Sequence, residues 1–193
     1  MNIIEGAGLF IYPLGLCSVL TLFILIERLI ALRTRRVIPI PISKKLAKGQ
    51  LPQWDDEPAS VAGKIIHFYQ ENEPDPESLK AFSKNEVSRM ERGLFILDII
   101  VGAAPLLGLL GTVMGLIQVF SHISAETGMP EPGAFIQGIA LALTTTMLGL
   151  AIAIPALVGN SYLGRKIEVL SSKLEILLEH LLSLSTDSDE SSD

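Results

Sequence analysis

The sequence has few of the residues from which soluble enzymes build reactive or metal-binding sites. Its 193 residues include one cysteine, three histidines and one tryptophan, and aromatic residues make up only 6%. The single Cys17 cannot form an intrachain disulfide, and three scattered histidines do not make a metal site. The sequence has no glycine-rich phosphate loop, nucleophile elbow or pair of catalytic carboxylates. We therefore expect neither an enzyme nor a cofactor, and no basic aromatic face indicates nucleic-acid binding.

Basic residues are missing from two long parts of the chain, and these parts hold the apolar residues. All 15 Lys and Arg lie between Arg28 and Arg92 or between Arg165 and Lys173. Three uncharged, apolar blocks cover residues 7–26, 99–120 and 135–163. A helix of about 20 residues crosses a hydrocarbon core about 30 Å thick, so each block can span a bilayer. None alternates as a membrane strand does. The fold class is therefore an all-α membrane protein with three transmembrane helices.

The charge distribution also predicts the orientation of the spans. Because Lys and Arg favour the cytoplasmic side, the Arg28–Arg92 loop and the C-terminus should be cytoplasmic. The N-terminus and the turn after the second span should then be periplasmic, in a bacterial inner membrane. The first span has Glu5 before it and its positive charges after it, which is the reverse of a cleaved signal peptide. We expect this span to stay as an anchor.

These patterns divide the chain into segments. We expect a periplasmic N-terminus (1–6), transmembrane helices at 7–32, 93–120 and 135–163, a cytoplasmic loop (33–92) and a periplasmic turn (121–134). A cytoplasmic amphipathic helix (164–182) and a disordered acidic tail (183–193) should follow. Within the loop, the pattern predicts a helical turn near 44–47 and a helix over 59–72 with Ser60 as N-cap. A further helix from Pro76 should continue into the second span without a break.

The second and third spans combine small, hydroxyl and proline residues. The glycines predict close helix packing and the prolines predict kinks; these residues are Pro105, Gly108, Gly111, Gly115, Gly149 and Pro155. Thr112 lies in the second span, and three consecutive threonines, 144–146, cover most of the circumference of the third. Hydroxyl groups suit ion passage, because they donate and accept while binding weakly. Neither span holds an acid at its middle, so a titrating carboxylate must come from another chain.

The strings SVLTLFILIER, APLLGLLGTVMGL and TTTMLGLAIAIPALVGN resemble the MotA/TolQ/ExbB family of ion-channel proteins, most closely its ExbB/TolQ branch. The resemblance implies a homopentameric ring around two copies of a single-span partner of the ExbD/TolR type. That partner carries a membrane Asp, and a TonB-like protein can join them. Transported H⁺ would drive mechanical work on the cell envelope, as in TonB-type import or Tol-type processes. The resemblance places Thr112 and Thr146 on the ion path and Glu27 at its inner mouth.

Some alternatives stay open at this point. Thr145 stands where proton-driven relatives often have alanine, and a second hydroxyl there would suit Na⁺, so a sodium-driven motor is an alternative. Glu27 can also be an interfacial anchor beside Arg28. The chain is shorter than typical relatives, mainly in the loop and tail. A non-conducting membrane scaffold is the alternative from another class, whereas a stand-alone pore is disfavoured because the spans lack charge.

Overall fold

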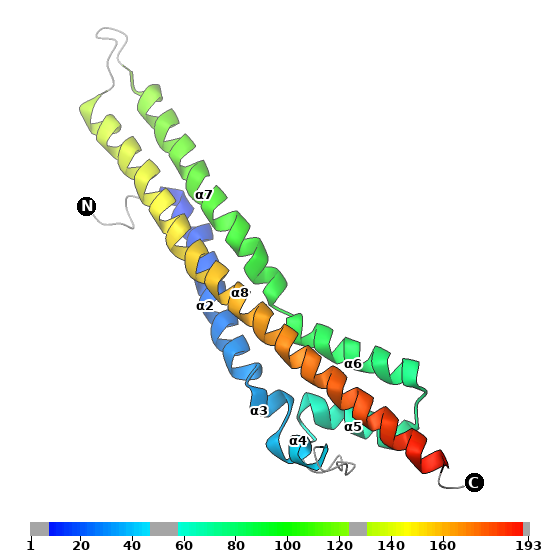
Figure 1. Cartoon of the computed structure of the whole chain (residues 1–193). Helices are drawn as coiled ribbons and strands as arrows, with labels where there is room; N and C mark the ends of the chain where they lie inside the picture. Colours follow the sequence, from blue (N-terminus) through cyan, green and yellow to red (C-terminus); the bar gives the residue numbers. More distant parts are fainter. Residues whose placement is uncertain (1–7, 47–57, 124–130, 191–193) are drawn as a thin grey trace. The chain divides into compact units, whose positions relative to one another are not determined.

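The protein is described from a computed structural model, which describes residues 8–46, 58–123 and 131–190. Helices make up almost all of the described chain (Figure 1). In chain order they are η1 (Gly8–Phe10), α2 (Ile11–Ala31), α3 (Thr34–Val37), α4 (Ile40–Leu46), α5 (Val61–Asn72), α6 (Pro76–Glu91), α7 (Leu94–Ser121) and α8 (Pro132–Glu190). The whole of the predicted N-terminus and parts of the predicted loop, outer turn and tail lie outside the described residues.

Three of the described helical stretches are long and apolar enough to cross a membrane, as predicted. They correspond to α2, α7 and the first half of α8. Large apolar side chains such as Leu22, Leu106 and Leu143 are mostly exposed on these helices. Exposed apolar side chains are unfavourable in water but favourable against lipid tails. The all-α membrane fold class is therefore confirmed, while the ring remains a prediction.

The chain divides into two compact units. The first combines the described residues up to Ile26 with residues 93–161, and it contains the apolar parts of α2, α7 and α8. The second combines residues 27–92 with the described residues from Tyr162 onward. It contains α3 to α6 and the end of α8. The two units thus separate the predicted membrane helices from the predicted cytoplasmic elements.

The second unit is built by capping and apolar burial. Ser60 accepts a hydrogen bond from the Gly63 backbone N–H at 2.9 Å and caps α5, as predicted. Phe68 on α5 stacks on Phe82 of α6, with ring centroids 4.2 Å apart. The apolar stripe predicted on the C-terminal half of α8 is buried at every position, which are Ile167, Leu170, Leu174, Leu177, Leu178 and Leu181. An amphipathic helix buries such a stripe by turning it toward the core of the protein.

One acid, Glu86, is buried in this unit. Its carboxylate lies 2.8 Å from Arg89 and 3.5 Å from Lys64, and only 4% of its side chain is exposed. Burying a carboxylate is unfavourable unless it is paired, so the two cations make this position tolerable.

The helix predicted from Pro76 into the second span is not continuous. It ends at Glu91, and α7 starts at Leu94 after Gly93, which has φ 91°. The expectation depended on the absence of Gly and Pro between residues 77 and 92, and it overlooked Gly93 itself. Glycine takes a positive φ without steric cost, so it can end a helix there.

Two other expectations differ from the structure. The first part of the loop, for which the pattern predicts only a helical turn near 44–47, contains α3 and α4, and Pro41 lies in the first turn of α4. A proline is tolerated there because its missing N–H has no helical partner at that position. The segment predicted as a disordered tail is helical up to Glu190. It contains no Gly or Pro, so the preceding helix can elongate at low cost.

Candidate functional site: the α7 and α8 helix pair

Within the first unit, α7 packs against α8 through matched rows of small residues (Figure 1). The rows have the same spacing of four, three and four residues: Ala104, Gly108, Gly111 and Gly115 on α7, and Gly138, Ala142, Thr145 and Gly149 on α8. A Cβ atom built on Gly149 would lie 2.6 Å from the Ala104 carbonyl oxygen. One built on Gly108 would lie 2.9 Å from the Thr145 carbonyl oxygen. The backbones are therefore in direct contact, as small residues allow.

Thr145 fills the centre of this contact. Thr145 is fully buried, and a Cβ built on Gly111 would overlap with its side chain. Its hydroxyl lies 2.8 Å from the Leu141 carbonyl and 3.3 Å from the Gly108 carbonyl on α7. A hydroxyl has one hydrogen, so it donates to one of these acceptors at a time. Thr145 therefore packs as a knob into the hole that Gly111 leaves on α7, which we call the glycine hole. Its hydroxyl oxygen is buried in this contact.

Thr146 and Thr112 are more open than Thr145. Both are only partly buried. The Thr146 hydroxyl donates to the Ala142 carbonyl at 3.1 Å and also lies 3.4 Å from the Gly108 carbonyl. The Thr112 hydroxyl donates to the Leu109 carbonyl at 2.6 Å. Such bonds to the helix's own backbone use the hydrogen and leave the oxygen free to accept. Among the described residues no hydrogen bond joins Thr112 to Thr145 or Thr146.

The two prolines lie inside continuous helices. Pro105 is half-buried on α7, and Pro155 is exposed on α8. Because proline has no N–H, the carbonyls of Val101 and Ala151 lack their helical partner four residues on. Each proline therefore places an available acceptor within a predicted span.

Charged groups lie near those ends of the spans that are predicted to be cytoplasmic. Glu27 on α2 is 46% exposed, and its carboxylate lies 2.9 Å from Nε of Arg28. Arg28 also donates to the Met90 carbonyl at 3.4 Å. In the first unit, Nδ2 of Asn160 on α8 donates to the Asp98 carboxylate on α7 at 3.5 Å. The pair of Asp98 with Asn160 was not predicted. Its signal was the one acid of the second span and the one amide near the end of the third.

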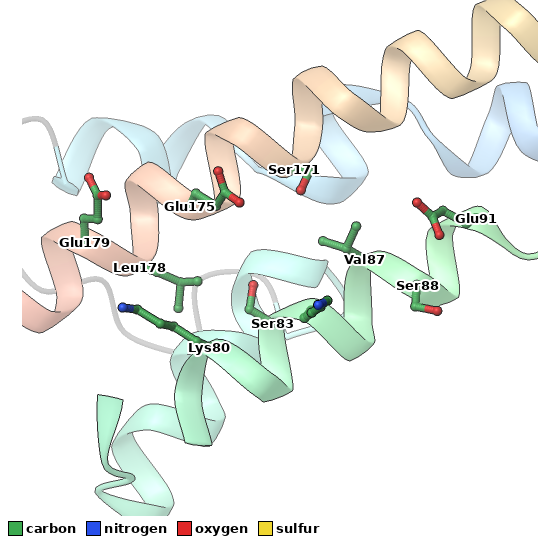
Figure 2. Close-up of a pocket in the computed structure, with 10 residues that line it drawn as sticks. Lys80, Ser83, Val87, Ser88, Glu91, Ser171, Glu175, Leu178 and Glu179 are labelled. Atoms are coloured by element: carbon green, nitrogen blue, oxygen red, sulfur yellow. The ribbon is translucent and has the colours of Figure 1, made fainter. Parts of the chain in front are cut away.

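The second unit contains a groove between α6 and the end of α8 (Figure 2). It has a volume of about 640 Å³. Lys80 and Lys84 come from α6, whereas Glu175 and Glu179 come from α8. The described residues contain no salt bridge across this groove, so both rows of charge are available to a partner. Nor do they contain a group of His, Cys, Asp and Glu that could hold a metal ion.

The fold and the helix pair define a multi-pass membrane protein with hydroxyl groups and backbone carbonyls along two closely packed spans. Residues 55–176 match the MotA/TolQ/ExbB proton channel family. The chain belongs to this family, which confirms the resemblance drawn from the three strings.

Individual relatives agree with this assignment. The chain is 31% identical over 196 residues to biopolymer transport protein exbB1 of Vibrio cholerae, covering 92% of this chain and 84% of that protein. It is 40% identical over 101 residues to biopolymer transport protein ExbB of Helicobacter pylori, covering 51% and 69%. It is also 27% identical over 146 residues to biopolymer transport protein ExbB of Neisseria gonorrhoeae, covering 76% and 66%.

Proposed function

We propose that this chain is the channel and motor subunit of an ion-driven energy transducer in the bacterial inner membrane. The main support is that the partly buried Thr112 and Thr146 lie on two helices whose backbones are in direct contact. A rigid frame holds these oxygens in place, and weak oxygen ligands let an ion pass without trapping it. The ExbB names of the relatives support a role in energising biopolymer transport, of the TonB-dependent or Tol type.

The transducer needs a second chain. The spans of this chain carry no acid at mid-membrane, so the carboxylate that binds and releases the ion must be supplied from outside. We propose a ring of this chain, a pentamer by family resemblance, around a single-span ExbD/TolR-like partner that carries a membrane Asp. The N-terminus would be periplasmic and the C-terminus cytoplasmic, because Lys and Arg flank the spans on one side only. Glu27, paired with Arg28, would mark the cytoplasmic end of the first span.

We propose the proton as the transported ion. The sodium alternative depended on Thr145 as an extra oxygen ligand. Its complete burial against Gly111 supports a packing role instead. A closed hydroxyl that donates to backbone carbonyls cannot approach a passing cation without separating the two helices.

The test is ion flux in proteoliposomes that hold the chain with its single-span partner. Thr146→Val keeps the shape of threonine but removes the hydroxyl, so flux should fall by about tenfold or more, since a lost hydrogen-bond partner is worth about 1.4 kcal/mol. Thr146→Ser, which keeps the hydroxyl, is the matched control and should stay close to wild type. Thr145→Ala should leave the ion preference unchanged. Normal flux through an assembled Thr146→Val complex would contradict the proposal.

A non-conducting scaffold is the second candidate, and the charged groove of the second unit favours it. Its rows of lysine and glutamate could bind a cytoplasmic protein without ion flow. The same variants separate the two functions. A scaffold would tolerate Thr146→Val fully, but it would lose its partner when Lys80 and Lys84 are replaced by glutamate.

A further inference from the structure

We infer that Asp98 and Asn160 form the cytoplasmic mouth of the ion path that contains Thr112 and Thr146. The inference rests on the proposed function and names the acid through which the ion enters or leaves on the cytoplasmic side. The ion chemistry is that of a small monovalent cation, H⁺ or Na⁺, which is bound by oxygen atoms.

Asp98 and Asn160 share a helical register with the two hydroxyls. Asp98 precedes Thr112 on α7 by 14 residues, and Asn160 follows Thr146 on α8 by 14 residues. At 3.6 residues per turn, 14 residues make about four turns, so each pair lies on one face of its helix, about 21 Å apart. Asp98 and Asn160 are therefore matched to the two hydroxyls in both face and depth. Both helices remain unbroken between these positions.

Among the described residues, the Asn160 side chain has an unsatisfied hydrogen-bond acceptor. Oδ1 of Asn160 is buried and has no hydrogen-bond partner in the described part of the chain, while Nδ2 faces Asp98. An unsatisfied buried acceptor is unfavourable, and natural proteins keep one mainly where water, an ion or a reaction requires it. The Asp98 carboxylate is exposed beside it. The Asp98 carboxylate and the Asn160 amide oxygen thus supply acceptor oxygens on two neighbouring side chains, which is the chemistry that a hydrated cation needs.

The Asp98 carboxylate has no salt bridge among the described residues. Asp98 therefore has no ion-pair partner in the described part of the chain, whereas Glu27 is paired with Arg28. An uncompensated carboxylate attracts cations to a channel entrance.

The face between the mouth and the hydroxyls offers a further polar step. Pro105 lies midway between Asp98 and Thr112 and leaves the carbonyl of Val101 without its helical N–H. Gly102 is exposed, with nothing within 4 Å of where its Cβ would lie. No side chain of the described residues therefore covers the helix backbone at this position. Acceptors thus continue from Asp98 toward Thr112 instead of ending at the cytoplasmic surface.

The experiment measures ion flux through the full chain and its single-span partner in proteoliposomes. Pyranine reports protons and ²²Na⁺ reports sodium, so the two arms identify the cation. Asp98→Asn keeps the size of the side chain and its contact with Asn160 but removes the charge. It should lower flux about tenfold and raise the cation concentration needed for half-maximal flux, because a charged entrance raises local cation concentration by about 10-fold or more. Asp98→Glu should restore most of the flux.

Glu168→Gln is the matched control, because Glu168 is an exposed acid of the second unit that is already paired. It should leave flux unchanged. Thermal unfolding of each variant shows whether it folds. A folded, assembled Asp98→Asn complex with wild-type flux and half-saturation would overturn the inference alone. If the wild type itself conducts neither cation, the proposed function fails, and the inference fails with it.

Discussion

Replacing Gly111 by alanine should weaken the contact between α7 and α8. The added methyl group would overlap with the Thr145 side chain, including its Cβ, which is attached directly to the backbone. A rotamer change cannot move a Cβ, so the helices themselves must separate. Overpacking of this kind costs up to about 3 kcal/mol. The gain in helix propensity from glycine to alanine returns about 1 kcal/mol. The net loss in free energy of unfolding is then about 2 kcal/mol.

The measurement is thermal unfolding in mild detergent. Unfolding is monitored by the reaction of a dye with Cys17, the only cysteine of the chain. A loss of about 2 kcal/mol should lower Tm by about 4–8 °C. Gly102→Ala is the matched control on the same helix, because a Cβ there meets nothing within 4 Å. It should be neutral or stabilising by about 0.5–1 kcal/mol.

A knob-for-hole exchange tests the reasoning more sharply. Thr145→Gly alone removes the knob, and Gly111→Ala combined with Thr145→Gly refills the space from the other side. The double variant should be more stable than the sum of the two single effects, with a coupling energy of about 2 kcal/mol. A Gly111→Ala protein as stable as Gly102→Ala, or additive effects in the double variant, would refute the contact as described.

Two predictions concern the second unit. Ser60→Ala removes the N-cap of α5 and should cost about 1 kcal/mol, seen as faster amide hydrogen exchange at Gly63, whereas Ser60→Asp should retain protection. At the start of α6, hydrogen bonds from the Ser78 hydroxyl and backbone N–H lower the pKa of Asp75 below its ordinary value. A lowered folded-state pKa means that this cap stabilises above the unfolded-state pKa, about 3.9, and is lost as pH falls through the lower value. Protection of the Ser78 amide should therefore decrease in acid, and Asp75→Asn should abolish that dependence; unchanged protection in wild type would contradict it.

The sequence predicted what depends on local pattern. The apolar blocks, the Ser60 cap and the leucine stripe of α8 each follow from residue spacing within one element, and the structure contains all of them. The break at Gly93, the short helices α3 and α4, and the extension of α8 were harder to predict. A helix end can depend on a single residue such as Gly93. Small residues on both spans also indicated close helix packing without indicating which pairs meet.

The roles of the three threonines could not be separated from the sequence. Consecutive residues point about 100° apart on a helix, so the three threonines had to face different directions, and at least one had to face a neighbour or a cavity. Which one depends on the rotation of α8, and that rotation is set by the glycine hole on the other helix. Thr145 enters the hole at Gly111, and this leaves Thr146 at its edge. The Asn160 contact with Asp98 depends on the same rotation, which explains why the sequence did not predict that these two residues pair.

The matched rows of small residues also predict which positions of the protein tolerate substitution. Where two backbones touch, any side chain larger than the native one must push the helices apart, so a saturating mutational scan should reject substitutions at a repeat of four, three and four positions on both helices. Exposed positions between them, such as Leu106, Leu109 and Leu143, should accept most apolar residues. A helix pair joined in this way has no soft layer of side chains to absorb strain. It should therefore move as one piece, and it would carry a displacement along its whole length without loss.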